Sequence, residues 1–140
     1  IGLDRTGDGA DDLVVPRMVI PVDKKVLIRL TSRDVLHSFF LPNFRVKQDA
    51  VPALTGKVWL QATQTSAQIM GTVDPATAGG FDARVGYAKP FDIICAELCG
   101  QGHYKMKGQL YVVSQELYDK FIEDESKQLA PAGDAVDDLF

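Results

Sequence analysis

Short segments in which apolar and polar side chains alternate run through most of this chain, and they constrain its fold more than any other feature. Residues 26–31 place Val26, Ile28 and Leu30 on one face of an extended strand, which is typical of a sheet with one buried face. About seven short strands without an internal repeat indicate an all-β sandwich. Comparable segments predict further strands at residues 18–22, 35–41, 57–63, 91–95 and 109–113.

The helical period is recognisable only after Ser114. Ser114 is a suitable N-cap, and Glu116 in the following turn complements the positive end of the helix dipole. Leu117 and Phe121 then lie four residues apart on one helix face. The sequence therefore predicts one short helix at the C-terminal end of the sandwich.

A length of 140 residues is the size of one ordinary domain. Gly and Asp dominate residues 1–13, which we interpret as an N-terminal arm, and residues 14–124 as the domain. The remainder, 125–140, has few large apolar side chains and is interpreted as a flexible acidic tail. A Gly-containing stretch at 71–86 is expected to form a long surface loop.

The formal net charge of -4 argues against nucleic acid as a partner. The acidity belongs to the ends, because residues 1–12 hold 4 acids and 1 base and residues 116–140 hold 8 acids and 2 bases. Residues 13–115 hold 7 acids and 12 bases and are therefore basic. No apolar run is long enough to span a bilayer, and a chain that begins at Ile1 is expected to be a processed form or a fragment.

The residues with the clearest chemistry lie in the segment 95–106, CAELCGQGHYKM. It holds two thiols, an imidazole and a thioether, from Cys95, Cys99, His103 and Met106. These are soft to borderline ligands, and their combination selects copper over Mg²⁺ or Ca²⁺. The other histidine of the chain is His37.

Three simpler interpretations of this segment stay open on spacing alone. One face of a buried helix fits the spacing, although Gly100 and Gly102 each weaken a helix by about 1 kcal/mol. A disulfide between the two cysteines leaves the imidazole and the thioether unexplained. A tetrahedral zinc site from the two cysteines and two histidines satisfies the ligand count and leaves Met106 as a packing residue.

Three separated motifs together resemble the CuA domain of cytochrome c oxidase subunit II. They are the Cys-x-Glu-x-Cys-Gly-x-x-His-x-x-Met pattern of residues 95–106, DVLHSF at 34–39 and VKQDAVP at 46–52. The resemblance covers about Val19 to Ile122. It implies a cupredoxin-like Greek-key β-sandwich that binds two copper ions as a binuclear CuA centre.

The resemblance also implies a role for each candidate ligand. The thiolates of Cys95 and Cys99 would bridge both copper ions, while His37 and His103 would each bind one. Met106 would be a weak axial ligand, and Glu97 would offer its backbone carbonyl.

Three acidic side chains are assigned by the same resemblance to the surroundings of the centre. The carboxylate of Glu97 would reach a magnesium ion shared with the catalytic subunit. Asp49 would lie near that boundary, and Asp34 near the docking region of the electron donor.

The function implied by the resemblance is electron transfer from a cytochrome c-like donor to haem in the catalytic subunit of a terminal oxidase. No turnover is expected from this chain alone. Its place would be the extracytoplasmic face of an energy-transducing membrane, on the bacterial periplasmic side or in the mitochondrial intermembrane space. N-terminal membrane helices that members usually carry, or partner subunits, would attach it to the membrane. The only tryptophan, Trp59, is expected in the core. Either the chain is a fragment that lacks the family's Trp- and Tyr-rich entry strand, or electrons enter through another group such as Phe39 or Tyr104.

Two other copper proteins share part of the pattern. The CuA domain of nitrous oxide reductase has the same ligand set, but its motif usually lacks the Glu found here. A Sco-type copper chaperone uses Cys-x-x-x-Cys and a distant His, yet it has a thioredoxin-like fold with Pro where this chain has Gly100. A hydrolase triad is excluded because Asp34, His37 and Ser38 are too close in sequence.

Overall fold

The computed structural model describes residues 13–79 and 82–129. The predicted arm, except for Leu13, and residues 130–140 of the predicted tail lie outside this part of the chain. No helix in the described part is long and apolar enough to cross a membrane.

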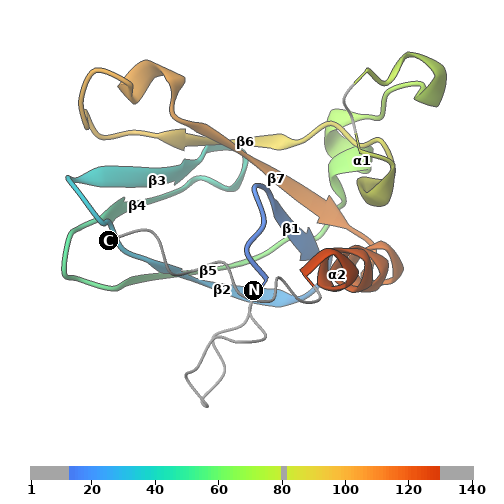
Figure 1. The fold of residues 1–140 in the computed structure, drawn as a ribbon, viewed down its shortest axis with the longest axis horizontal. Helices are drawn as coiled ribbons and strands as arrows, with labels where there is room; N and C mark the ends of the chain where they lie inside the picture. Colours follow the sequence, from blue (N-terminus) through green and yellow to red (C-terminus); the bar gives the residue numbers. More distant parts are fainter. Residues whose placement is uncertain (1–12, 80–81, 130–140) are drawn as a thin grey trace.

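Seven strands form two layers (Figure 1). The five-stranded sheet has the order β1-β7-β6-β3-β4, in which β1 runs parallel to β7 and the other neighbours are antiparallel. The second layer is the antiparallel pair of β2 and β5. The bounds are β1 Met18–Pro21, β2 Lys25–Leu30, β3 His37–Leu41, β4 Val46–Ala50, β5 Gly56–Gln61, β6 Phe91–Cys95 and β7 Lys107–Val113.

Two apolar clusters hold these layers together. The larger lies between the sheets and includes Leu41, Leu60 and Leu110, all of them buried. The smaller lies beneath α2 (Gln115–Leu129), where Phe121 is fully buried against β1 and β7 residues such as Val19. The helix begins as predicted, because the Ser114 Oγ accepts a hydrogen bond from the Leu117 N–H at 3.3 Å.

The helix continues to Leu129, so the segment after residue 124 begins as helix and not as tail. The reason is an ion pair at 2.5 Å between Glu125, which is 9% exposed, and Arg84. Arg84 also pairs with Asp82, which Arg17 contacts at 2.7 Å from the start of β1. This partly buried network ties the helix to the loop and the sheet.

The described parts of the stretch at 71–86, residues 71–79 and 82–86, contain more regular structure than the expected surface loop. This stretch follows a short helix, α1 (Ser66–Met70), and contains two 3-10 turns, η2 (Pro75–Thr77) and η3 (Ala83–Val85). Val85 is buried in the cluster under α2. The Ser66 hydroxyl, also buried, accepts a hydrogen bond from the Val112 N–H at 2.8 Å. This segment is therefore part of the packed domain.

Trp59 does not lie in the core, which corrects the expectation. Its side chain is 67% exposed on the outer face of β5. The alternation places it with Lys57 and Gln61, whereas Leu60 points inward and is 4% exposed.

Candidate metal centre

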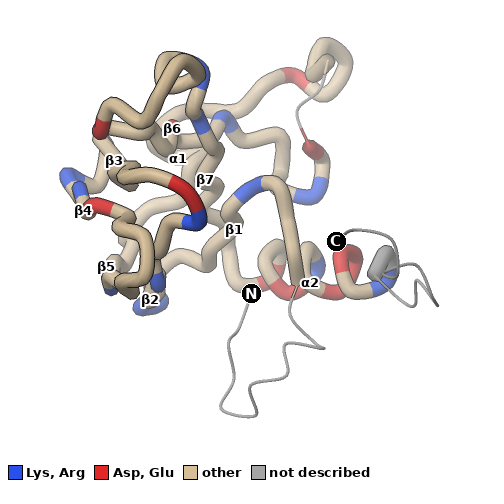
Figure 2. The backbone as a smooth tube through the Cα atoms, turned by 60° about the vertical axis from the view of Figure 1, so that its left-hand side comes forward, with Lys and Arg blue, Asp and Glu red and all other residues tan. Residues whose placement is uncertain are grey.

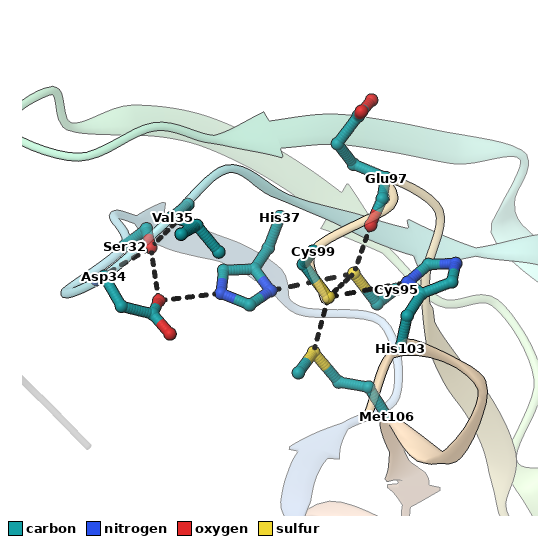
Figure 3. A network of polar contacts seen from close by, with 9 residues as sticks. All are labelled: Ser32, Asp34, Val35, His37, Cys95, Glu97, Cys99, His103 and Met106. Atoms are coloured by element: carbon teal, nitrogen blue, oxygen red, sulfur yellow. Dashed lines mark hydrogen bonds and ion pairs between the residues drawn. The ribbon is translucent and has the colours of Figure 1, made fainter. Parts of the chain in front are cut away.

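One end of the sandwich brings the candidate ligands together (Figure 3). His37 is the first residue of β3 and Cys95 the last residue of β6, which are neighbours in the five-stranded sheet. Cys99 lies in the loop after β6, His103 begins the 3-10 turn η4 (His103–Lys105), and Met106 directly precedes β7. The sheet thus fixes two ligands directly and clamps the loop that carries the others.

The sulfur atoms of the two cysteines lie 3.7 Å apart and form the middle of the cluster. His37 Nδ1 is 3.8 Å from the Cys95 sulfur, and His103 Nδ1 is 3.5 Å from the Cys99 sulfur. The Met106 sulfur lies 3.8 Å from that of Cys99. Both thiols are free, so the predicted soft donors converge without a disulfide. Ligand atoms of His37, Cys95 and Cys99 lie within 4.8 Å of one another.

Glu97 faces the cluster with its backbone and not with its side chain. Its carbonyl oxygen is 3.3 Å from the Cys95 sulfur, while its carboxylate points away (Figure 3). The donor set around the sulfurs is therefore two thiols, two imidazole nitrogens, a thioether and a carbonyl oxygen. This set fits copper and does not suit Mg²⁺ or Ca²⁺.

Backbone hydrogen bonds hold the ligand loop. The Ala96 N–H donates to the Ser38 carbonyl at 3.0 Å, and the His103 N–H donates to the Gly100 carbonyl at 3.1 Å. Gly100 has a φ of 129°, which L side chains rarely adopt, so glycine permits this turn between Cys99 and His103. Contacts within the protein itself therefore define the shape of the ligand loop.

Asp34 orients His37, a role that spacing alone did not reveal. Its carboxylate accepts a hydrogen bond from His37 Nε2 at 2.8 Å, which leaves Nδ1 directed at the sulfurs. This bond, together with hydrogen bonds from the Val35 backbone and the Ser32 side chain, lowers the pKa of Asp34 to about 2, and the bonds from Asp34 and Cys95 raise the pKa of His37. Ser32 supports the carboxylate through a 3.1 Å hydrogen bond. Such an outer carboxylate fixes both the tautomer and the direction of a metal-binding imidazole.

We predict that Asp34→Asn lowers the pKa of His37, because the carboxylate that favours the imidazolium is removed. The loss of orientation should weaken metal binding by about 10- to 100-fold. An NMR pH titration of the metal-free protein and a copper competition titration measure the two effects. Asp49→Asn, on exposed β4, is the control, and equal losses in both variants would contradict the role of Asp34.

The two thiols differ in acidity. Burial alone raises the pKa of Cys95, but backbone hydrogen bonds at Ser38 and Glu97 and side-chain bonds with His37 and Cys99 lower it to about 6. Burial and the neighbouring Cys95 raise the pKa of Cys99. In the metal-free protein at pH 7, the thiolate is therefore carried by Cys95.

We predict that iodoacetamide modifies Cys95 before Cys99 at pH 7, because the thiolate is the nucleophile. The rate at Cys95 should rise with pH and reach half its maximum near pH 6. Peptide mass spectrometry of briefly labelled protein measures both sites. A first modification at Cys99, or equal rates at both thiols, would disprove this order.

The remaining predicted residues lie at the edge of the cluster. Asp49 is exposed on β4, opposite Ser38 in the strand register. The Ser38 hydroxyl is buried and has no hydrogen-bond partner among the described residues, and Tyr104 is 74% exposed. A cavity of about 290 Å³ adjoins the cluster and is lined by His37, Cys95 and Met106 together with apolar residues such as Leu30, Phe39 and Ile93.

Comparisons with known proteins point to one family. Residues 8–73 match the family described as "Cytochrome C oxidase subunit II, periplasmic domain". An alternative cytochrome c oxidase subunit 2 from Bradyrhizobium diazoefficiens is 33% identical over 128 residues, covering 89% of this chain and 38% of the relative. The chain thus spans about two fifths of the length of that relative.

Solved structures agree with the sequence comparisons. The periplasmic domain of subunit II of cytochrome oxidase from Bradyrhizobium japonicum has a TM-score of 0.62 and 30% identity, covering 81% of this chain and 66% of that one. A mixed disulfide between a thioredoxin-like protein and subunit II of cytochrome c oxidase has a TM-score of 0.57 and 29% identity, covering 81% and 64%. The family match ends at residue 73 and therefore does not include the ligand loop. The evidence for a metal centre in that loop is the geometry described above.

Proposed function

Because this chain belongs to the family of the periplasmic domain of cytochrome c oxidase subunit II, we propose that it transfers electrons through a binuclear copper centre. The observation that carries the proposal is the convergence of two free thiols, 3.7 Å apart, with two imidazoles and a thioether. A copper pair sharing two thiolates spreads one electron over both metals, which lowers the reorganisation cost of transfer.

The chain's own residues supply rigidity and selectivity. Cys95 and Cys99 would bridge the metals, with His37, His103, Met106 and the Glu97 carbonyl completing the donor set. The end of β6 and the start of β3 fix one thiol and one imidazole, and Asp34 fixes the imidazole's tautomer. Ligands held by strands need little rearrangement when charge enters or leaves.

Exposed apolar side chains around the ligand loop support docking of redox partners there. The set comprises Leu98 at 78%, Tyr104 at 74%, Leu36 at 50%, Val35 at 46% and Met106 at 42% exposure. Apolar groups grouped on a surface are typical of interaction sites. We propose that a cytochrome c-like donor docks at this rim, with Asp34 at its margin, and that electrons pass to haem in the catalytic subunit of a haem-copper oxidase.

The outward carboxylate of Glu97 supports a second metal role. Its backbone faces the thiols while its carboxylate points away, so one residue can contact the copper site and a boundary with another subunit (Figure 3). A carboxylate oxygen suits Mg²⁺, and we propose that Glu97 contributes to a magnesium site shared with the catalytic subunit, with Asp49 near the same boundary. We propose that the domain lies on the extracytoplasmic side of an energy-transducing membrane, which its similarity to periplasmic domains of subunit II supports.

The alternatives differ in their support. The observed sandwich has no βαβ units in its described part, which argues against the thioredoxin-like fold of a Sco-type chaperone. The CuA domain of nitrous oxide reductase remains a second candidate on ligand set alone, but the relatives described above are oxidase subunits.

Metal analysis tests the proposed function. The reduced, metal-free chain is loaded with excess copper, desalted and measured for copper per chain. Two copper ions per chain, retained against an equal concentration of zinc, are expected. One copper per chain, or replacement of copper by zinc, would favour a mononuclear or tetrahedral site instead.

A further inference from the structure

The outer face of the two-stranded sheet carries cations around an exposed tryptophan. Side chains alternate along β2 and β5, so every second residue points away from the core. The strand register sets Trp59 directly opposite Leu27, and Arg29 opposite Lys57. We call this surface the β2–β5 face, and its six residues are Lys25, Leu27, Arg29, Lys57, Trp59 and Gln61.

The centre of the β2–β5 face is apolar and uncovered. Trp59 is 67% exposed and Leu27 is 61% exposed, whereas Ile28 and Leu60 on the inner side are buried. Neither exposed side chain belongs to the candidate metal centre or to its apolar rim. Tryptophan and arginine are the residue types that contribute most often to protein–protein binding energy.

The border of the face is basic. Lys25, Arg29 and Lys57 lie there, and none of the six residues is acidic. Figure 2 shows basic segments at β2 and β5, while acidic segments lie along α2. An apolar centre with a charged border resembles the core and rim of a protein interface, so the complementary surface is acidic.

We propose that the β2–β5 face binds a second protein, and that the docking surface of this partner is acidic around an apolar centre. A second copy of this chain fits less well. One acidic surface of such a copy is α2, whose exposed side chains from Gln115 to Lys127 are all polar and match Trp59 poorly. Its apolar rim around the ligand loop, beside Asp34, is the surface proposed above for the electron donor. An anionic membrane would also attract these cations, but two apolar side chains offer it only a small area to bury.

Zero-length carbodiimide cross-linking tests the proposal in membranes from cells that produce the full-length protein. The reagent joins a lysine amine to a carboxylate that contacts it, and mass spectrometry then locates the bond. We expect Lys25 or Lys57 to be joined to Asp or Glu of a different polypeptide. Exposed Lys89, outside the face, should give no such product.

The matched variants are Trp59→Ala and Lys57→Glu, and both change exposed side chains, so the fold should persist. Each should reduce the cross-link at Lys25 by roughly tenfold or more, because an interface centre or a complementary charge is lost. Trp59→Phe should retain much of it. A cross-link unaffected by these variants, or no intermolecular product at Lys25 and Lys57, would overturn the proposal.

Other occupants of the face give different products. Cross-links to Asp134, Asp137 or Asp138 of the same chain would mean that its own acidic segment covers the face. Cross-links between isotopically distinct copies would mean self-association. Because Trp59 is the only tryptophan, a saturable fluorescence shift with vesicles of phosphatidylglycerol and phosphatidylcholine would indicate a membrane. Each of these outcomes overturns the proposal. The test is also independent of the proposed copper centre, because Trp59 is not a candidate ligand and Trp59→Ala should leave the copper content unchanged.

Discussion

A Cys99→Ser chain is expected to lose the proposed binuclear centre. Cys99 is the thiol closest to both His103 and Met106, and its sulfur lies 3.7 Å from that of Cys95. A hydroxyl is a poor replacement for a thiolate at a soft metal site, and a single remaining thiolate cannot form a double sulfur bridge. Copper content should therefore fall from two ions per chain to one or fewer.

Leu98→Ala provides the matched control for this variant. Leu98 precedes Cys99 in the same loop, is 78% exposed and offers no ligand atom. Its replacement should leave the copper content and the visible spectrum unchanged. Two retained copper ions in Cys99→Ser, measured by metal analysis with an unchanged absorption spectrum, would show that Cys99 does not bridge.

Phe121→Ala is expected to be strongly destabilising, although the residue lies outside the metal centre. Phe121 is fully buried beneath α2, in the cluster with Val19 and Val85, and the Arg84 guanidinium lies 5.6 Å from its ring centroid. Removing a buried phenyl ring leaves a cavity and costs about 3–5 kcal/mol of the free energy of unfolding. Urea denaturation of the metal-free protein measures this loss.

Lys120→Ala, one position earlier on the exposed side of α2, is the control and should change the free energy of unfolding by about 0.5 kcal/mol or less. Folded Phe121→Ala should still bind two copper ions, because the ring is not among the groups around the thiols. A loss below about 1 kcal/mol would mean that α2 contributes little to the stability of the sandwich.

The sequence predicted the architecture well where patterns were regular. The all-β sandwich with a C-terminal helix is confirmed, and its cupredoxin-like character agrees with the oxidase subunit II structure that it resembles. Ser114 begins the helix as its side chain suggested. Strand β4 was harder to recognise, because Lys47, Gln48 and Asp49 are all exposed at the edge of the sheet.

The start of α1 and the outward position of Trp59 could both have been predicted from sequence patterns. Thr65 and Gln68 form a capping box at the start of α1, a pattern readable as Thr-x-x-Gln. Trp59 alternates with buried Leu60 and shares its face with Lys57, which already indicated an outward position. The alternation along β5 decides which side of the sheet Trp59 faces.

At the candidate centre, residue types singled out the segment 95–106, and the resemblance to subunit II added His37 and the Glu97 carbonyl to the side chains expected to converge. The second role of Asp34 could not be predicted in the same way. A separation of three residues from His37 places the carboxylate near the imidazole only because the loop turns there, with Ser32 hydrogen-bonded to both Asp34 and the Val35 carbonyl. Loop geometry of this kind is not encoded in a periodic pattern.

Electron paramagnetic resonance of the copper-loaded chain tests the central claim most directly. If Cys95 and Cys99 bridge two copper ions, one unpaired electron is shared between two copper nuclei, and the hyperfine pattern reports both of them. We predict that shared-electron spectrum for the unmodified chain and its absence in Cys99→Ser. A spectrum in the unmodified chain that shows coupling to a single copper nucleus would contradict the account.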